Sequence, residues 1–218
     1  MSVYAFSDIH GNYGLFCQIK NFLKPDDICY VLGDVIDRGT EGYRILKEIL
    51  ADTRFKMLRG NHEDMFIKTS KDVLNKDFDD WFSEAKDLWY MNGGQPTYRA
   101  WKFDNFNIDI IKYLKSLPLH FQYKNYYMSH SGYYVDPQSS ISKELMHRLL
   151  WDRGHIYSTK PNTPDDIIII HGHTPTRDRV PIFYNNNGTL KIDIDCGTAL
   201  THKIYLFNLD TQEYQIFE

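Results

Sequence analysis

Short apolar runs that end in carboxylate, imidazole or amide residues are the feature that most constrains the fold of this chain. The first run ends at Ser7-Asp8-Ile9-His10-Gly11, and the next segment repeats its apolar residues with helical spacing. The same order of strand, polar loop and helix then recurs. The predicted elements are strands at Val3–Phe6, Ile28–Leu32 and Phe55–Leu58, with helices at Leu15–Leu23 and Gly42–Leu50. This alternation predicts a parallel α/β core.

The chain changes character between about residues 64 and 119, where many charges surround aromatic residues and a Gly93-Gly94 break. We predict a mostly helical insertion there. Strand patterns return at Tyr126–Met128 and Ile167–Ile170, and two hairpins are predicted to turn at Asn187-Gly188 and near Asp210. The expectation is a single α/β domain over residues 1–218, with parallel strands first and antiparallel strands last.

Composition excludes several classes of protein. The net charge of −4 gives no electrostatic footprint for nucleic acid or an anionic membrane. No apolar run approaches the roughly 18 residues of a membrane span. The three cysteines are far apart in sequence, which is not how a disulfide framework looks. We therefore expect a cytoplasmic protein with no nucleic-acid or membrane partner, and the sequence leaves its oligomeric state open.

The polar residues that follow the predicted strands are a set of potential metal ligands. Ligand sites in α/β sheets lie beyond the carboxyl ends of the strands, so residues from several strand ends can converge. Carboxylates, imidazoles and one amide form a set that suits manganese, iron or zinc. A shared carboxylate can bridge two ions, the arrangement that promotes displacement at phosphorus. The residues at these strand ends are Asp8, His10, Asp34, Asp37, Arg38, Asn61, His62, His130 and His173.

Four motifs together carry a resemblance to a known family. They are Asp8-Ile9-His10-Gly11, Gly33-Asp34-Val35-Ile36-Asp37-Arg38-Gly39, Arg59-Gly60-Asn61-His62-Glu63 and Gly172-His173-Thr174-Pro175. With the four motifs in this order, the chain resembles the metallophosphoesterases of the phosphoprotein phosphatase type, especially the shorter bacterial and phage members. The resemblance covers residues 3 to about 200 and implies a four-layer αββα sandwich with mixed sheets and a helical insertion.

The resemblance also implies a role for each residue. Asp8 and His10 would hold a first divalent ion, Asp34 would bridge, and Asn61, His130 and His173 would complete a second site. Manganese is the first expectation, with iron or zinc as alternatives, and a bridging hydroxide would attack phosphorus directly. His62 would be the general acid, oriented by Asp37. The residues expected to contact the phosphate are Arg38, Arg153, Asn61 and His62.

Several alternatives remain open at this stage. Taken alone, Asp8 after a strand is more typical of a helix cap, and Arg59 could form a salt bridge. His171 could ligate, but Pro175 occupies the position where nuclease-like relatives have a second histidine, so we expect a supporting or structural role. The aromatic residues of the insertion could stack on a nucleobase, although at helical spacing they more often form core.

The function expected from these observations is hydrolysis of phosphomonoesters, with a phosphoprotein bearing phosphoserine, phosphothreonine or phosphotyrosine as the first choice of substrate. Asp37 favours this choice, because the related symmetrical diadenosine tetraphosphatases commonly have alanine there. The alternative within enzymes is hydrolysis of a dinucleoside polyphosphate. A noncatalytic binding module with the same fold is the alternative outside them.

Overall fold

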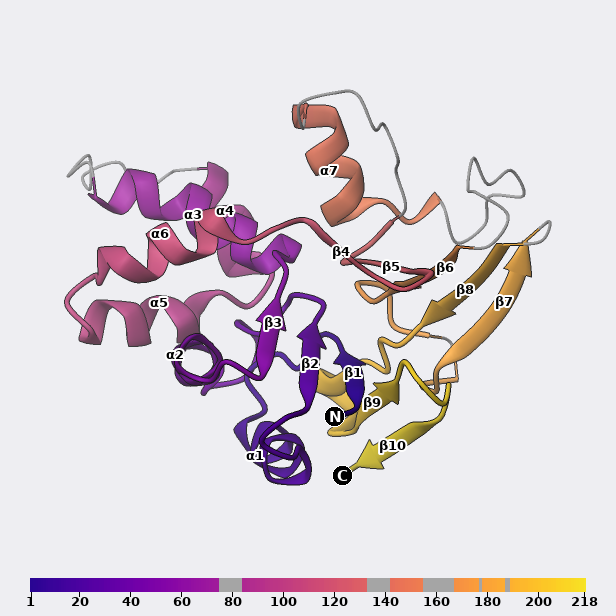
Figure 1. Cartoon of the computed structure of the whole chain (residues 1–218). Coiled ribbons are helices and arrows are strands. Elements are labelled where there is room, and N and C mark those ends of the chain that lie inside the picture. Colours follow the sequence, from indigo (N-terminus) through magenta and orange to yellow (C-terminus); the bar gives the residue numbers. More distant parts are fainter. Residues whose placement is uncertain (75–83, 133–141, 155–166, 177, 187–188) are drawn as a thin grey trace.

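The computed structural model describes residues 1–74, 84–132, 142–154, 167–176, 178–186 and 189–218, which form two five-stranded sheets with helices around them (Figure 1). The first sheet has the order β10-β9-β1-β2-β3. Its strands are β1 (Val3–Phe6), β2 (Ile28–Val31), β3 (Phe55–Met57), β9 (Ile204–Asn208) and β10 (Tyr214–Phe217). Strands β1, β2 and β3 are parallel, whereas β9 and β10 are antiparallel additions at one edge.

The second sheet has the order β4-β5-β6-β8-β7. Its strands are β4 (His120–Tyr123), β5 (Tyr126–Ser129), β6 (Ile168–His171), β7 (Ile182–Asn186) and β8 (Thr189–Asp193). The central β5, β6 and β8 are parallel, and the two edge strands are antiparallel to their neighbours. Both sheets are therefore mixed, as predicted.

Side chains along each strand point alternately to the two faces of the first sheet, so this sheet contributes to two hydrophobic cores. In β1, Val3 and Ala5 face the second sheet, where they join Met128 and Ile170 in a buried cluster. Phe6, the residue after Ala5, faces the other way, into a larger core with helices α1 (Tyr13–Phe22) and α2 (Gly42–Ala51). Helix α7 (Lys143–Trp151) lies beside the second sheet in Figure 1. The predicted sandwich of two sheets between helices is confirmed.

Four helices form a separate group beside the first sheet (Figure 1). They are α3 (Asn61–Leu74), α4 (Glu84–Met91), α5 (Gln95–Phe103) and α6 (Ile108–Ser116). Phe66, Trp89 and Trp101 are fully buried there, with Phe66 stacked on Trp89 at 5.0 Å between ring centroids. These aromatic residues form core, as expected from their spacing. Trp81 and Phe82, which the sequence places in the same aromatic set, lie outside the described residues.

Three elements were not predicted from the sequence, and helix α7 is the longest of them. Strand β4 is a short edge strand whose residues are at most half-buried, and its turn into β5 uses Lys124 at a positive φ of 52° rather than a glycine. Helix α9 (Thr198–Thr201) is one turn long. Among the described residues, no helix is both long and apolar enough to cross a bilayer.

Candidate metal centre and acid pair

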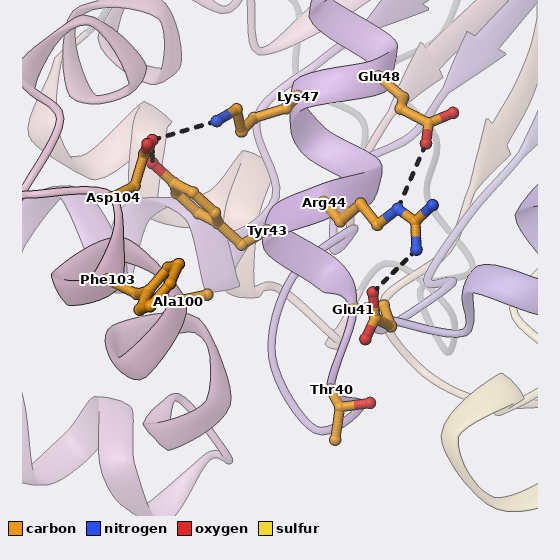
Figure 2. Close-up of a pocket in the computed structure, with 9 residues that line it drawn as sticks. All are labelled: Thr40, Glu41, Tyr43, Arg44, Lys47, Glu48, Ala100, Phe103 and Asp104. Carbon is orange, nitrogen blue, oxygen red and sulfur yellow. Dashed lines mark hydrogen bonds and ion pairs between the residues drawn. The ribbon is translucent and has the colours of Figure 1, made fainter.

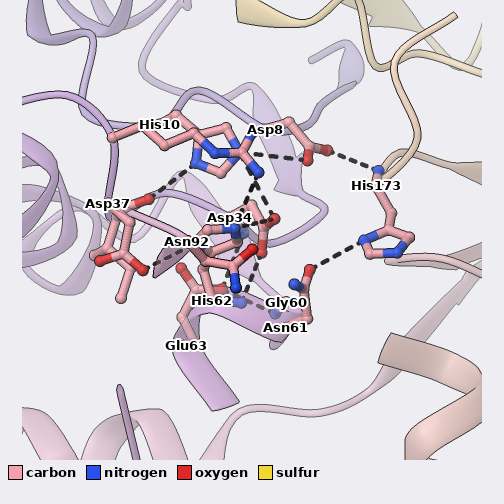
Figure 3. Close-up of polar contacts among 12 residues, drawn as sticks. Asp8, His10, Asp34, Asp37, Gly60, Asn61, His62, Glu63, Asn92 and His173 are labelled. Carbon is pink, nitrogen blue, oxygen red and sulfur yellow. Dashed lines mark hydrogen bonds and ion pairs between the residues drawn. The ribbon is translucent and has the colours of Figure 1, made fainter. Parts of the chain in front are cut away.

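The predicted ligands come together where loops leave the carboxyl ends of strands in both sheets (Figure 3). Asp8 and His10 follow β1, Asp34 follows β2, and Asn61 opens α3 just after β3. His130 and His173 follow β5 and β6 of the second sheet. All six side chains are buried, with relative exposures of 7% or less. The packing of the two sheets therefore brings residues 165 positions apart into one site.

Many of these residues have left-handed backbone conformations that non-glycine residues seldom adopt. The φ angles are 56° at Asp8, 44° at His10, 55° at Asp34, 69° at Asp37, 63° at Arg38 and 72° at His173. Each such residue costs about 1–3 kcal/mol and persists only where its surroundings enforce it. Here backbone hydrogen bonds link the loops, including His10 N to Asp34 O at 3.0 Å and Gly11 N to Val35 O at 2.9 Å. The concentration of strain marks these loops as functional.

The His10 side of the site presents a bare imidazole nitrogen to two carboxylates. His10 Nδ1 donates to the carbonyl of Ile36 at 3.0 Å, so Nε2 carries the free lone pair. That Nε2 is buried, has no hydrogen-bond partner, and lies 3.8 Å from Asp8 Oδ1 and 3.7 Å from Asp34 Oδ2. Burial lowers the pKa of His10 well below its usual value, which keeps the ring neutral as a ligand must be.

The His130 side contains acceptor atoms that face one another. His130 Nδ1 donates to the carbonyl of Leu32 at 2.7 Å, which leaves Nε2 as an acceptor. This Nε2 lies 2.7 Å from Asn61 Oδ1 and 3.4 Å from Asp34 Oδ1. His173 Nδ1 lies 3.0 Å from the same Asn61 oxygen. The facing lone pairs of His130 Nε2 and Asn61 Oδ1 repel at this separation unless a cation lies beside them, so the donor set fits a metal ion.

Electrostatics point to the same conclusion. Burial raises the pKa of Asp34 well above its usual value, and the charge of Asp8 raises it further. Burial opposes ionisation of Asp8 too, but the neighbouring His130 and His10 rings, with the hydrogen bonds from His173 N–H and the Ser7 hydroxyl, hold the pKa of Asp8 below its usual value. Burial also lowers the pKa of His173 to about 2. Neutral imidazoles around crowded carboxylates are the environment that a divalent cation stabilises.

Asp34 is the residue common to both sides. Two groups of potential ligands have donor atoms that lie within 4.8 Å of one another: His10, Asp34 and His62, and Asp34, His130 and His173. His62 is the weaker candidate in the first group, because Arg38 Nη2 donates to its Nε2 at 3.2 Å. A guanidinium at that nitrogen occupies the lone pair and repels a cation. Asp8, 3.8 Å from His10, suits the position better.

His62 and Asp37 form a tight pair that we call the acid pair. His62 Nδ1 donates to Asp37 Oδ2 at 2.7 Å. Asp37 also accepts from Trp89 Nε1 at 2.7 Å and from Thr97 Oγ1 at 2.6 Å. Burial raises the pKa of Asp37 to about 7, but a group that accepts from three donors is best satisfied as a carboxylate. The pair orients the His62 ring with Nε2 toward Arg38 and Asp34.

Trp89 and Thr97 were not assigned to the site from the sequence. They stand on α4 and α5, 52 and 60 residues from Asp37. The same segment reaches Arg38, whose N–H donates to the carbonyl of Gly93 at 2.9 Å. The helical group therefore supports the acid pair directly.

Glu63 was also missed, although it stands in one of the motifs. Its buried carboxylate accepts from the N–H groups of Asp34, Val35 and Gly60, each at 2.9 Å. It thereby joins the loop after β2 to the loop after β3. Gly60 is required nearby, because a Cβ at that position would overlap the Asp34 side chain. The signal available in the sequence was its place in the motif, directly after Asn61 and His62.

The remaining predicted residues lie at the edge of the site. Arg38 is exposed and contacts His62. Arg153 lies just after α7, is exposed, and is close enough for its charge to lower the pKa of His173.

Two residues whose roles the sequence left open have structural contacts. Arg59 pairs with Asp64 at 3.7 Å, which is the salt bridge considered for it as an alternative. His171 is fully buried and its Nδ1 lies 3.1 Å from the carbonyl of Gly172, consistent with a structural role.

Two mixed sheets with buried histidine, aspartate and asparagine side chains at their strand ends define the class of metal-dependent phosphoester hydrolases. The family model described as calcineurin-like phosphoesterase matches residues 1–200. This chain belongs to the calcineurin-like phosphoesterase family, whose members use divalent metal ions.

Sequence relatives come from two groups within the family. Serine/threonine-protein phosphatase 2 of Salmonella typhimurium is 24% identical over 220 residues, which cover 95% of this chain and 92% of that protein. A symmetrical bis(5'-nucleosyl)-tetraphosphatase of Buchnera aphidicola is 31% identical over 94 residues, which cover 40% of this chain and 34% of that protein. The match to the tetraphosphatase thus spans only about a third of its length.

Solved structures share the fold. A metallophosphoesterase from Sphaerobacter thermophilus is similar with a TM-score of 0.60 at 16% identity, over 100% of this chain and 89% of that one. A putative diadenosine tetraphosphatase gives a TM-score of 0.62 at 15% identity, over 99% and 92%. At these identities the similarity establishes the fold alone.

Proposed function

We propose that this protein is a binuclear metal-dependent phosphomonoesterase whose substrates are phosphoproteins. The observation that carries the proposal is that Asp34 lies within 3.8 Å of imidazole nitrogens from both sides of the site, at His10, His62 and His130. A carboxylate in that position can serve two ions at once. The protein phosphatase branch is supported by the Salmonella relative, which aligns along nearly the whole chain.

In this proposal Asp8, His10 and Asp34 hold one ion, and Asp34, Asn61, His130 and His173 hold the other. Manganese is the proposed metal, because carboxylate, amide and imidazole ligands suit it, although iron and zinc accept the same set. When bound, two such ions supply a hydroxide nucleophile at neutral pH and polarise the phosphoryl oxygens.

The residues outside the ligand set divide the remaining tasks. The exposed guanidinium of Arg38 binds nonbridging phosphate oxygens, and Arg153 is proposed to bind the phosphate from the other side. His62 delivers a proton from Nε2 to the leaving oxygen. Because Nδ1 of His62 is hydrogen-bonded to Asp37, the ring cannot rotate away from the site. Arg38 now donates to Nε2, so its guanidinium must move from Nε2 to the phosphate before Nε2 can carry a proton.

A second candidate substrate is a dinucleoside polyphosphate. The match to the Buchnera tetraphosphatase favours it, since that relative shares 31% identity over the 94 aligned residues. The tight Asp37–His62 pair favours the phosphatase branch instead, because the resemblance described above implies that the tetraphosphatases commonly have alanine at this position.

Metal-stripped protein separates these proposals. The assay would add back manganese, zinc or magnesium and measure hydrolysis of para-nitrophenyl phosphate, phosphoserine, phosphothreonine and phosphotyrosine peptides, and diadenosine tetraphosphate. We expect manganese-dependent turnover of the monoesters. Turnover of the dinucleotide alone would overturn the phosphoprotein assignment. Folded protein that is inactive with every metal and substrate would support the noncatalytic alternative.

A further inference from the structure

Two neighbouring cavities extend from the candidate metal centre along the protein surface. The first, of about 450 Å³, begins at His10 and Arg38 and continues past Tyr13 to His202. The second, of about 460 Å³, lies between α2 and α5 and is lined by Tyr43, Ala100 and Phe103 together with charged residues (Figure 2). We call the first the catalytic groove and the second the α2–α5 pocket. Thr40 and Glu41 line both, so the two lie side by side.

The α2–α5 pocket has an apolar lining that no other part of the described chain covers. Phe103 is 91% exposed although it is a phenylalanine, and Ala100 precedes it by one helical turn on α5. Across the pocket the ring of Tyr43 is buried and fixed, because its hydroxyl donates to Asp104 at 2.8 Å. An exposed aromatic residue beside a rigid apolar wall is typical of a recognition site.

The charges around the pocket are already paired within the protein. Arg44 lies between Glu41 and Glu48, at 3.5 and 3.6 Å (Figure 2). Its guanidinium also lies 3.8 Å from the ring of Tyr13. Lys47 contacts Asp104 at 3.3 Å. Among the lining residues three carboxylates face two cations. Lys20, which does not line the pocket, pairs with Glu48 at 2.7 Å, so the charges around the pocket are balanced and none of the lining cations is unpaired.

We propose that the α2–α5 pocket binds an apolar side chain of a polypeptide substrate whose phosphorylated residue occupies the catalytic groove. The proposal rests on the proposed phosphoprotein phosphatase function and names a determinant of its specificity. Because the pocket and the catalytic groove share Thr40 and Glu41 in their walls, an extended chain bound in the groove would lie beside the pocket. A polyphosphate would meet no unpaired cation among the residues that line the pocket, whereas an apolar side chain needs none.

A leucine scan tests the proposal. A phosphoserine peptide of glycine and serine would carry one leucine, moved by one position at a time on either side of the phosphoserine. We expect kcat/KM to peak at one position by about tenfold, the value of burying one aliphatic side chain. Phe103→Ala should abolish the peak, and Ala100→Arg, which fills the pocket, should do the same. Hydrolysis of para-nitrophenyl phosphate should be unchanged in both variants.

Leu50→Ala is the matched control, since Leu50 is an exposed apolar residue on the same α2 that does not line the pocket. It should retain the leucine peak. Peptide turnover with no preferred position, or a peak that survives in both pocket variants, would overturn the docking site alone. Failure to turn over any peptide, with aryl phosphate still hydrolysed, would overturn the phosphoprotein function as well. Loss of diadenosine tetraphosphate turnover in Phe103→Ala would assign the pocket to a nucleobase instead.

Discussion

The acid pair and the His130–His173 ligands lie on opposite sides of Asp34, and they are held in different ways. Asp37 is fixed by the side chains of Trp89 and Thr97, which the helical group supplies. On the other side His130 is fixed by backbone groups, because its ring donates to the Leu32 carbonyl and Gly172 N donates to the His130 carbonyl. A single side-chain substitution can therefore disturb the position of Asp37, whereas the backbone contacts that hold His130 do not depend on any one side chain. Mutations should therefore separate chemistry from metal binding.

The largest effect is expected at Asp34, which serves both regions. Asp34→Asn keeps the size of the side chain but removes the charge that offsets two cations. We expect kcat for para-nitrophenyl phosphate to fall by about a thousandfold or more, corresponding to several kcal/mol of lost transition-state stabilisation. Metal content per chain should fall below two ions by atomic spectroscopy. Retention of two ions with near-normal activity would remove Asp34 from the bridging position.

His62 and His10 should differ, although both rings lie near Asp34. We expect His62→Asn to keep its bound metal and to lose about a hundredfold in kcat with an alkyl phosphate, but much less with an aryl phosphate whose leaving group needs little protonation. His10→Asn should instead lose one ion and impair both substrates alike. The assay compares metal stoichiometry with the ratio of alkyl to aryl turnover. Equal losses on both substrates in His62→Asn would contradict the acid role.

The sequence was informative about the ligands because each stands at a strand end, inside a short motif. The strand ends of Val3–Phe6 and Ile28–Val31 had clear apolar patterns, and parallel pairing brings them together without any further information. Strand β4 lacked such a pattern because it is a short edge strand, and its turn has a lysine where glycine or asparagine would have been the signal. Local patterns thus predicted the buried strands and missed this one edge strand.

The supports of the site were harder to predict, for a different physical reason. Trp89 reaches Asp37 only after α4 has packed on α3, so no local spacing connects the two residues. Its burial was predicted from aromatic spacing, but burial alone does not reveal where an indole N–H points. The left-handed conformations at Asp8, Asp34 and His173 arise from bonds between loops, which sequence periodicity does not encode. The domain boundaries at residues 1–218 and the insertion at 64–119 stay predictions.

Two buried tryptophans offer a closer test of the acid pair. Trp89 and Trp101 are both fully buried, both contact Phe66, and each donates one indole hydrogen bond, to Asp37 and to the Asn107 carbonyl respectively. Either Trp→Phe change should cost about 1 kcal/mol from the lost hydrogen bond, plus a packing penalty common to both.

Only Trp89→Phe should alter the chemistry. We expect kcat with an alkyl phosphate to fall roughly tenfold, because an outer partner of the acid pair has been removed. Trp101→Phe should leave it unchanged at matched stability, measured by urea unfolding. If both variants lost activity equally, the helical group would act through general stability and not through Asp37.

The smallest effect is expected at Ser7, which lies beside the metal ligands and away from the acid pair. Its hydroxyl donates to Asp8 Oδ2, the same oxygen that accepts from His173 N at 3.0 Å. Ser7→Ala removes one of the two donors that orient this carboxylate, so we expect the manganese concentration for half-maximal activity to rise about tenfold. The ratio of alkyl to aryl turnover at saturating manganese should not change, since His62 is untouched.

Ser70 provides the control for Ser7, because it is another buried serine, whose hydroxyl donates to the Ile67 carbonyl within α3. Ser70→Ala should leave the manganese requirement unchanged. A changed substrate ratio in Ser7→Ala would show that metal binding and proton delivery are coupled through Asp34 and not separable by region.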